Sequence, residues 1–180
     1  MAGRRRGFET LGDMVRSLGL VLVVVAVLVL ITLRPPGEEV RVVDYAQTLR
    51  LAGAGAPFPP ADAVGLPEGW RATSAYFDPP QRTGSPGVVR WHIGWLTPRD
   101  EYAAVEQGNG DAAALLEEQL GQAQPAGAST VGGQAWQRNT GTNGRRALTL
   151  ASGDVLTVVH GTADWGELEQ LAAALRPLPS

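Results

Sequence analysis

The chain has 180 residues, a length that suits one domain of ordinary size plus an appended segment. Cys is absent and all 15 basic residues are Arg, which excludes disulfides, zinc–thiolate sites, thiol nucleophiles and every reaction that needs a lysine. The net charge is −3, and beyond residue 34 ten Arg stand against sixteen Asp and Glu. An acidic domain with few aromatic residues argues against nucleic acid as a partner.

The first element is an apolar run at residues 17–33, which carries no charge and consists mostly of Leu and Val. As a helix, a run of this length spans roughly 25 Å, and the flanking Arg16 can extend its side chain toward lipid headgroups. Arg34 closes the run. We therefore predict a transmembrane helix at residues 17–34, preceded by a short cytoplasmic tail at residues 1–16.

Three alternative interpretations of this run fit the sequence less well. A buried core helix would have one polar face, and the run has none. A cleaved signal peptide needs a small-x-small site after the run, where residues 34–36 are Arg-Pro-Pro. A twin-arginine signal, suggested by residues 5–8, usually has a less hydrophobic run. The basic residues ahead of the run predict a cytoplasmic N-terminus and an outer C-terminal domain; they are Arg4, Arg5, Arg6 and Arg16.

Residues 35–67 are predicted to form a stalk and a wrapping loop. Within them, Asp44 is expected to cap a short helix at residues 45–51. A strand is predicted at residues 70–77, and a polar turn follows at residues 81–87.

The clearest strand in the sequence covers residues 89–95. Its apolar members Val89, Trp91, Ile93 and Trp95 alternate with Arg90, His92 and Gly94. This period of two is typical of a half-buried strand.

Two helices are then predicted. Thr97 and Pro98 resemble a helix start, which would turn Tyr102 and Val105 inward. Asp111 is expected to cap the second helix, with the apolar stripe Ala112, Leu115, Leu116 and Leu120. A loop is predicted at residues 121–130.

The C-terminal third is predicted to contain three short strands in a meander, at residues 134–138, 146–151 and 155–160. Asn143-Gly144 and Gly153-Asp154 are the turn signals between them. A last helix begins at Asp164, with Glu167 at capping-box spacing, and ends before Pro177. Strands and helices are mixed without strict alternation. This order predicts an α+β domain at residues 68–180, with an antiparallel sheet and helices packed on it.

The sequence indicates no catalytic, cofactor-binding or metal-binding residue. The two histidines, His92 and His160, both fall in predicted strands, and no Ser lies in a G-x-S-x-G elbow. A metal site made by both histidines and a carboxylate would require neighbouring strands. The simpler interpretation is two hydrogen-bonded strand histidines.

The five tryptophans are candidates for a ligand groove. Residues 70, 91, 95 and 136 fall in or beside predicted strands, where tryptophan most often belongs to the core. An aromatic groove for a sugar or a lipid is the functional alternative. The possible ligand or partner surface is therefore assigned to Trp70, Trp91, Trp95, His92 and His160.

Motifs spread along the chain also carry a family resemblance. They are Thr10 to Val15 before the apolar run, Leu66-Pro67 with Gly69 to Ser74, Thr97-Pro98 with Tyr102-Ala103, and Thr157 to Ala163. With these motifs the chain resembles an actinobacterial membrane-protein family catalogued only as domain-of-unknown-function family 4245. The resemblance implies a membrane anchor and an outer domain, and it brings no catalytic residue. The Pro-x-Gly-Trp turn also resembles the α/β/α sandwich of the Mog1 and PsbP type.

Three functions remain open at this point. The favoured one is a non-enzymatic extracytoplasmic module, held in the bilayer through residues 17–34, that binds an envelope protein or ligand. The second is an envelope hydrolase, or a lipid or sugar carrier, that uses a tryptophan-lined cleft. The third is an accessory subunit of a membrane complex.

Overall fold

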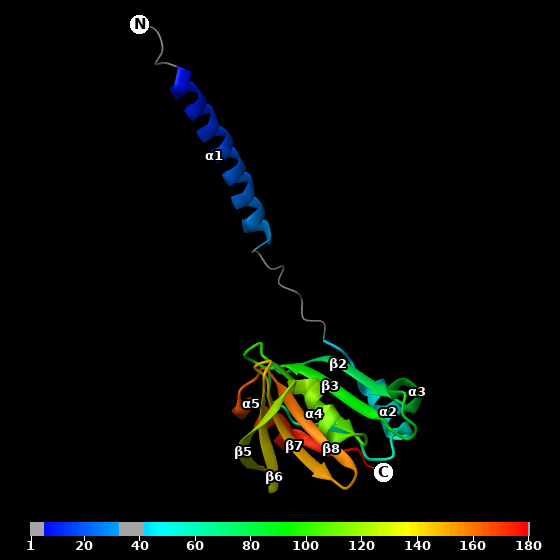
Figure 1. Ribbon diagram of the computed structural model, residues 1–180. Helices are drawn as coiled ribbons and strands as arrows, with labels where there is room; N and C mark the ends of the chain where they lie inside the picture. Colours follow the sequence, from blue (N-terminus) through cyan, green and yellow to red (C-terminus); the bar gives the residue numbers. More distant parts are fainter. Residues whose placement is uncertain (1–5, 33–41, 180) are drawn as a thin grey trace. The chain divides into compact units, whose positions relative to one another are not determined.

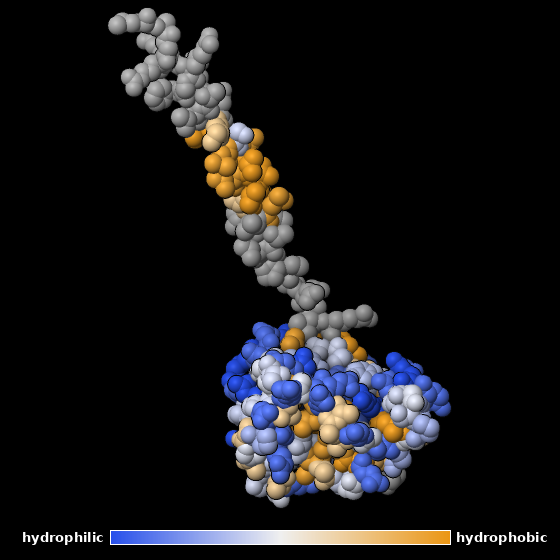
Figure 2. Space-filling model, viewed as in Figure 1, coloured by the Kyte–Doolittle hydropathy of each residue, from blue (hydrophilic) through white to orange (hydrophobic). Residues whose placement is uncertain are grey.

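The computed structural model describes residues 6–32 and 42–179, with side chains given from residue 14 to 28 in the first range and throughout the second. The chain divides into two compact units, residues 1–39 and residues 40–180. The first unit contains helix α1 (Arg6–Thr32). Every described side chain of α1 is exposed, and Figure 2 shows the apolar band that they form. Among these described residues, no helix combines the length and apolarity that a membrane crossing needs.

The second unit is built on a seven-stranded antiparallel sheet with the strand order β2-β3-β4-β8-β7-β6-β5. The strands are β2 (Arg71–Asp78), β3 (Arg90–Leu96), β4 (Tyr102–Gly108), β5 (Ala123–Val131), β6 (Gln134–Gly141), β7 (Arg146–Ser152) and β8 (Val155–Gly161). Two meanders, β2-β3-β4 and β5-β6-β7-β8, meet where β4 pairs with β8. A short ribbon of β1 (Ala61–Ala63) and β9 (Leu175–Pro177) forms a second sheet.

Helices cover both faces of the large sheet (Figure 1). They are α2 (Ala46–Gly55), the single turn α3 (Pro80–Thr83), α4 (Ala112–Leu120) and α5 (Trp165–Ala174). The main core lies between the sheet and the two helices α2 and α5, with Trp91, Ile93, Leu168 and Leu171 at its centre. A smaller core lies on the opposite face, where α4 covers β7 and β8. The domain is therefore α+β with an antiparallel sheet, as the sequence predicted.

Several predicted elements are confirmed in detail. In β3 the three residues Trp91, Ile93 and Trp95 are 0%, 0% and 3% exposed, so the alternation does identify the core side. His92 on the other side is also buried, so β3 is buried on both faces and not half-buried as predicted. The side chain of Asp111 accepts hydrogen bonds from the first turn of α4. The side chain of Asp164 caps α5 in the same way.

The prediction of a helix that starts at Thr97-Pro98 is wrong. Residues 97–101 form the tight connection of the β3–β4 hairpin, closed by hydrogen bonds from Thr97 N to Glu101 O and from Asp100 N to Thr97 O. Asp100 there has a positive φ of 59°. The chain then continues as β4, so Tyr102 and Val105 point to opposite faces of the sheet rather than to one side of a helix.

Two loop predictions are also wrong. Residues 121–130 contain most of β5, an edge strand with a register shift between Pro125 and Ala128 that accommodates a proline and a glycine. The wrapping segment contains β1, whose partner is β9. The predicted stalk at residues 35–41 lies outside the described residues.

Candidate functional site

In one half of the sheet, polar side chains line the face that points away from the main core. In β2, β3 and β4 the alternation turns one set of side chains away from the main core. The ladder places Ser74 opposite Gly94, Tyr76 opposite His92, and His92 opposite Glu106. We call the surface made by Ser74, Tyr76, His92, Tyr102 and Glu106 the polar face.

Three of these side chains form a continuous hydrogen-bonded chain. Ser74 Oγ lies 2.9 Å from His92 Nε2. His92 Nδ1 lies 2.6 Å from Glu106 Oε1. Because His92 is 4% exposed and Glu106 is 2% exposed, solvent reaches this chain mainly at the half-buried Ser74.

Tyr76 helps to determine which atoms donate and which accept in these hydrogen bonds. Its hydroxyl donates to Glu106 Oε1 at 3.1 Å, and its ring stacks on the imidazole of His92 with centroids 4.3 Å apart. Burial and the neighbouring Glu106 raise the pKa of Tyr76, so its phenol stays protonated and donates. Glu106 Oε1 is then an acceptor for both neighbours. In the tautomer that donates to this acceptor through Nδ1, His92 presents the lone pair of Nε2 to the Ser74 hydroxyl.

Tyr102 and Gly94 complete the surroundings of Ser74. The hydroxyl of Tyr102 pairs with the Ser74 side chain, and burial is the main reason that the pKa of Tyr102 is raised. A Cβ atom on Gly94 would lie 2.5 Å from Ser74 Oγ and 2.8 Å from the Tyr102 hydroxyl. Glycine is therefore needed at position 94 for this pairing.

His160 lies on the next strand of the same sheet face. In the ladder it stands opposite Ala104, and its ring meets that of Tyr102 edge to face at 6.3 Å. It is 1% exposed, and neither ring nitrogen has a hydrogen-bond partner among the described residues. Burial, with smaller effects of His92 and Arg145, lowers its pKa to about 3, so it is neutral at physiological pH. Glu106 Oε2 is also buried without a partner in the described part of the chain.

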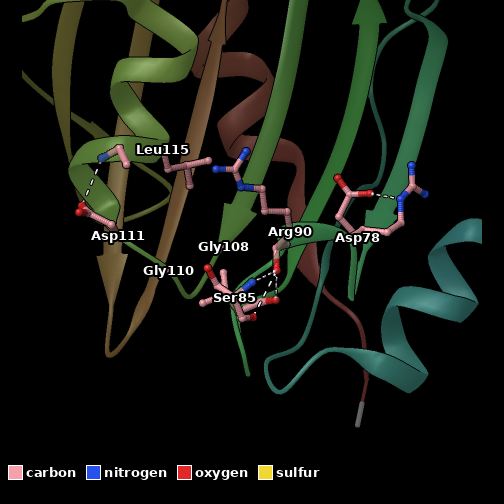
Figure 3. Close-up of a pocket in the computed structure, with 11 residues that line it drawn as sticks. Asp78, Ser85, Arg90, Gly108, Gly110, Asp111 and Leu115 are labelled. Atoms are coloured by element: carbon pink, nitrogen blue, oxygen red, sulfur yellow. Dashed lines mark hydrogen bonds and ion pairs between the residues drawn. The ribbon is translucent and has the colours of Figure 1, made fainter. Parts of the chain in front are cut away.

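A cavity of about 340 Å³ lies further along the same strands (Figure 3). Asp78 of β2 and Arg90 of β3 line it, together with Gly108 and the start of α4 at Asp111. Its charged groups are already paired, because Arg90 contacts Glu118 and Arg82 contacts Asp78. This cavity therefore offers few free charges to a ligand.

A second cavity, of about 370 Å³, lies on the opposite face of the sheet. Its walls contain polar and apolar groups in nearly equal measure and come from the 57–61 segment, β4, the β6–β8 strands, the end of α5 and β9; its large apolar members are Phe58, Trp136, Leu150 and Leu175. Trp136 is 3% exposed, and its indole N–H has no acceptor among the described residues. We call this cavity the Trp136 cavity.

The residues proposed from the sequence as a ligand or partner surface do not lie together. Trp91 and Trp95 are packed in the main core, and Trp91 Nε1 donates to the Ala61 carbonyl at 2.8 Å. Trp70 packs at the edge of that core and donates to Gln170 of α5 at 3.2 Å. His92 and His160 lie on the opposite face. Among the described residues, no group of three His, Asp or Glu side chains is arranged to hold a metal ion.

Sequence reasoning missed Ser74, Tyr76 and Glu106. A signal was present, because Ser74 and Tyr76 alternate with apolar residues just as His92 does in the next strand. Glu106 could not be found, because its segment was assigned to a helix. Without β4 as a strand, no sequence argument places Glu106 opposite His92.

Both cavities and the polar face belong to one small antiparallel α+β domain that follows a separate helical unit. A protein-family model described as "Protein of unknown function (DUF4245)" matches residues 6–175, and the chain belongs to this family. The comparison with curated proteins and the comparison with solved structures give no match. The likeness to the Mog1 and PsbP sandwich therefore stays a prediction.

Proposed function

We propose that this protein is a membrane-tethered extracytoplasmic module that binds an apolar component of the cell envelope in the Trp136 cavity. The observation that carries the binding function is the cavity itself, whose wall combines large apolar side chains with Trp136, and the buried indole N–H of Trp136 has no acceptor among the described residues. Apolar cavities with a few polar groups are the usual form of small-molecule sites, and about 300–1,000 Å³ is their usual size. The favoured ligand is an apolar molecule that carries a hydrogen-bond acceptor.

The polar residues of the Trp136 cavity fit this assignment. A buried indole N–H normally finds an acceptor, so an acceptor supplied by a ligand would satisfy Trp136. Gln107 is already engaged, because its Oε1 accepts from Ala61 N at 2.6 Å and its Nε2 donates to Thr157 at 3.1 Å. The amide of Gln107 is therefore not free to bind a ligand, which favours a ligand with few polar groups over a sugar with many hydroxyls.

The tether is supported by the uncharged run at residues 17–33 and by the basic residues before it. The large apolar side chains of α1 between Met14 and Leu28 are 47% to 68% exposed. An apolar surface of this extent in water favours association with lipid or with another helix.

The proposal places the N-terminus in the cytoplasm and residues 42–179 outside. A reporter enzyme that is active only in the cytoplasm, fused after Ser180, should therefore be inactive. An active fusion would reject the orientation.

The binding proposal can be tested with decanoic acid as an apolar probe and N-acetylglucosamine as a sugar probe. The full chain in lipid nanodiscs is titrated while tryptophan fluorescence is recorded. We expect saturable binding of the acid and none of the sugar. Trp136→Phe keeps the apolar wall, removes the indole N–H, and should weaken binding by about 5- to 10-fold, as expected for one lost hydrogen bond of about 1 kcal/mol.

A cavity-blocking variant supplies the control. Ser152 is exposed at the cavity rim, so Ser152→Trp should abolish binding of decanoic acid without disturbing the core. Ser85→Trp makes the same change at the other cavity and should leave binding unchanged. Equal binding by wild type and Ser152→Trp would exclude the Trp136 cavity as the site.

A further inference from the structure

We propose that Ser74 is the nucleophile of a hydrolytic site on the polar face, with His92 as its general base and Glu106 as the residue that orients His92, and that the substrate is a carboxylic ester. This inference is independent of the Trp136 cavity, which lies on the other face of the sheet, and of the tether. It rests on the contacts among Ser74, His92 and Glu106, on the distribution of their protons, and on the Tyr102 hydroxyl beside Ser74.

The atoms meet in the order that nucleophilic catalysis by a hydroxyl requires. The nucleophile contacts one ring nitrogen, Nε2, at 2.9 Å, and the carboxylate contacts the other, Nδ1, at 2.6 Å. Serine, histidine and an acidic residue in this arrangement are recognised by geometry rather than by sequence order or fold. The G-x-S-x-G elbow is one way of building such a site, and three adjacent strands are another.

The distribution of protons makes Nε2 of His92 a base. Tyr76 donates to Glu106 Oε1, and the tautomer with the imidazole proton on Nδ1 lets His92 donate to the same oxygen. Nε2 then has only a lone pair, and the Ser74 hydroxyl is the donor that faces it. The Tyr76 ring stacked on the imidazole also keeps water away from the His92–Glu106 contact. This is the arrangement that orients a general base and stabilises its protonated form.

The surroundings of Ser74 provide a hydrogen-bond donor for a reacting carbonyl. Gly94 lets the Ser74 and Tyr102 side chains lie close to the backbone of β3, because a Cβ atom at this position would clash with both. The Tyr102 hydroxyl lies beside Ser74 Oγ and stays protonated, so it can donate to the oxyanion of a tetrahedral intermediate. The guanidinium of Arg145 lies 5.7 Å from the centre of the Tyr102 ring and adds positive charge there. Arg145 makes no ion pair within the described residues, which favours an ester with a negatively charged group.

The reaction that follows balances with water as the second substrate. Ser74 Oγ bonds to the acyl carbon while its proton passes to Nε2 of His92. The leaving alkoxide departs with that proton as an alcohol. Water then attacks the acyl group, loses its proton to Nε2, and releases the carboxylic acid as the proton returns to Ser74. Each turnover converts one ester and one water into one acid and one alcohol.

The same contacts could instead serve only to satisfy polar groups on the sheet. A purely structural network is expected to satisfy each of its buried atoms, whereas Glu106 Oε2 has no partner among the described residues. A buried carboxylate held through one oxygen costs stability, which is common at functional sites. The two interpretations predict different reactivity for Ser74.

The test is covalent labelling of the full chain, in detergent micelles, with a fluorophosphonate probe. Mass spectrometry of the wild type should locate the phosphonyl group on Ser74, and p-nitrophenyl acetate should be hydrolysed. Ser74→Ala should remove the label and the hydrolysis. His92→Gln should slow labelling about 10²- to 10⁴-fold, the usual contribution of a general base. Ser85→Ala, a matched change at an exposed serine, should leave labelling unchanged.

The role of Glu106 as a positioning residue needs a separate readout. A proton held between Nδ1 and a carboxylate at 2.6 Å should give a strongly downfield imidazole N–H signal in the proton NMR spectrum. We expect this signal in wild type and in Ser74→Ala, and its loss in Glu106→Gln together with slower labelling. A wild-type protein that is not labelled at Ser74, or that is labelled equally fast in His92→Gln, would overturn the inference. Because the labelled position is read on wild-type protein, a variant that fails to fold does not affect this outcome.

Discussion

His160 shows the cost in stability of a buried imidazole to which no described residue forms a hydrogen bond. Its folded pKa is lowered to about 3 from a usual value of 6.5. The unfolded chain therefore binds one more proton than the folded domain once the pH falls below 6.5. The stability due to neutral His160 is fully present above pH 6.5 and is lost progressively as the pH falls toward 3.

We predict that the free energy of unfolding falls by about 2 kcal/mol between pH 7.5 and pH 5 because of this residue alone. The measurement is urea unfolding followed by tryptophan fluorescence, which reports on the domain because all five tryptophans lie at or beyond residue 70. His160→Gln removes the titration and should be less sensitive to pH over this interval by the same amount. An identical pH dependence in both proteins would contradict the lowered pKa.

At the scale of single residues, the sequence predicted which side chains of β3 face the core. It did not predict which residues of the neighbouring strands contact His92. The alternation of tryptophan and isoleucine with arginine and histidine located His92 on the side away from the core. It could not supply Ser74 or Glu106, because the partners of His92 come from other strands. Their contact depends on the register of three strands, which local sequence does not encode.

At the scale of elements, helix starts were predicted correctly where a side chain caps a real helix. Asp164 accepts a hydrogen bond from Glu167 N at 3.0 Å and also pairs with Arg99. Asp164→Ala should lower the free energy of unfolding by about 1 kcal/mol through loss of the cap. Asp164→Asn keeps the capping oxygen and removes the charge, so it should recover most of that loss in the same urea experiment. If asparagine were as harmful as alanine, the ion pair rather than the cap would hold the start of α5.

The two segments whose secondary structure was predicted incorrectly have a common physical explanation. Residues 97–107 carry a good local signal for a helix start, yet residues 102–108 become the central strand β4 because β3 and β8 flank it on both sides. Pairing with two neighbours outweighs a local preference worth about 1 kcal/mol. In β5, Pro125 and Gly127 resemble a loop, but an edge strand with an irregular register tolerates both. The conformation of these two segments depends on their position within the sheet. That position is known only once the order of all strands is known.

At the scale of the whole molecule, the prediction that remains to be tested is the tether. Residues 17–33 gain only a few tenths of a kcal/mol per leucine or valine on insertion, so the run inserts through the sum of many small terms. One arginine at the centre of a membrane helix opposes insertion by about 2.5–3.5 kcal/mol. Val24 and Val25 lie near the middle of the run. The double variant Val24→Arg, Val25→Arg should therefore cancel most of the gain and release the protein from membranes during alkaline carbonate extraction.

The matched control changes a valine outside the run. Val42 is 63% exposed in the second unit, so Val42→Arg adds a charge without changing the apolar segment. It should stay in the membrane pellet together with the wild type. Because the tryptophans and the Trp136 cavity all lie beyond residue 42, the released double variant should still bind decanoic acid with wild-type affinity. Release without loss of binding would separate the tether from the binding domain. Retention of the double variant in the pellet would instead show that the domain, or a protein partner, attaches the chain to the membrane.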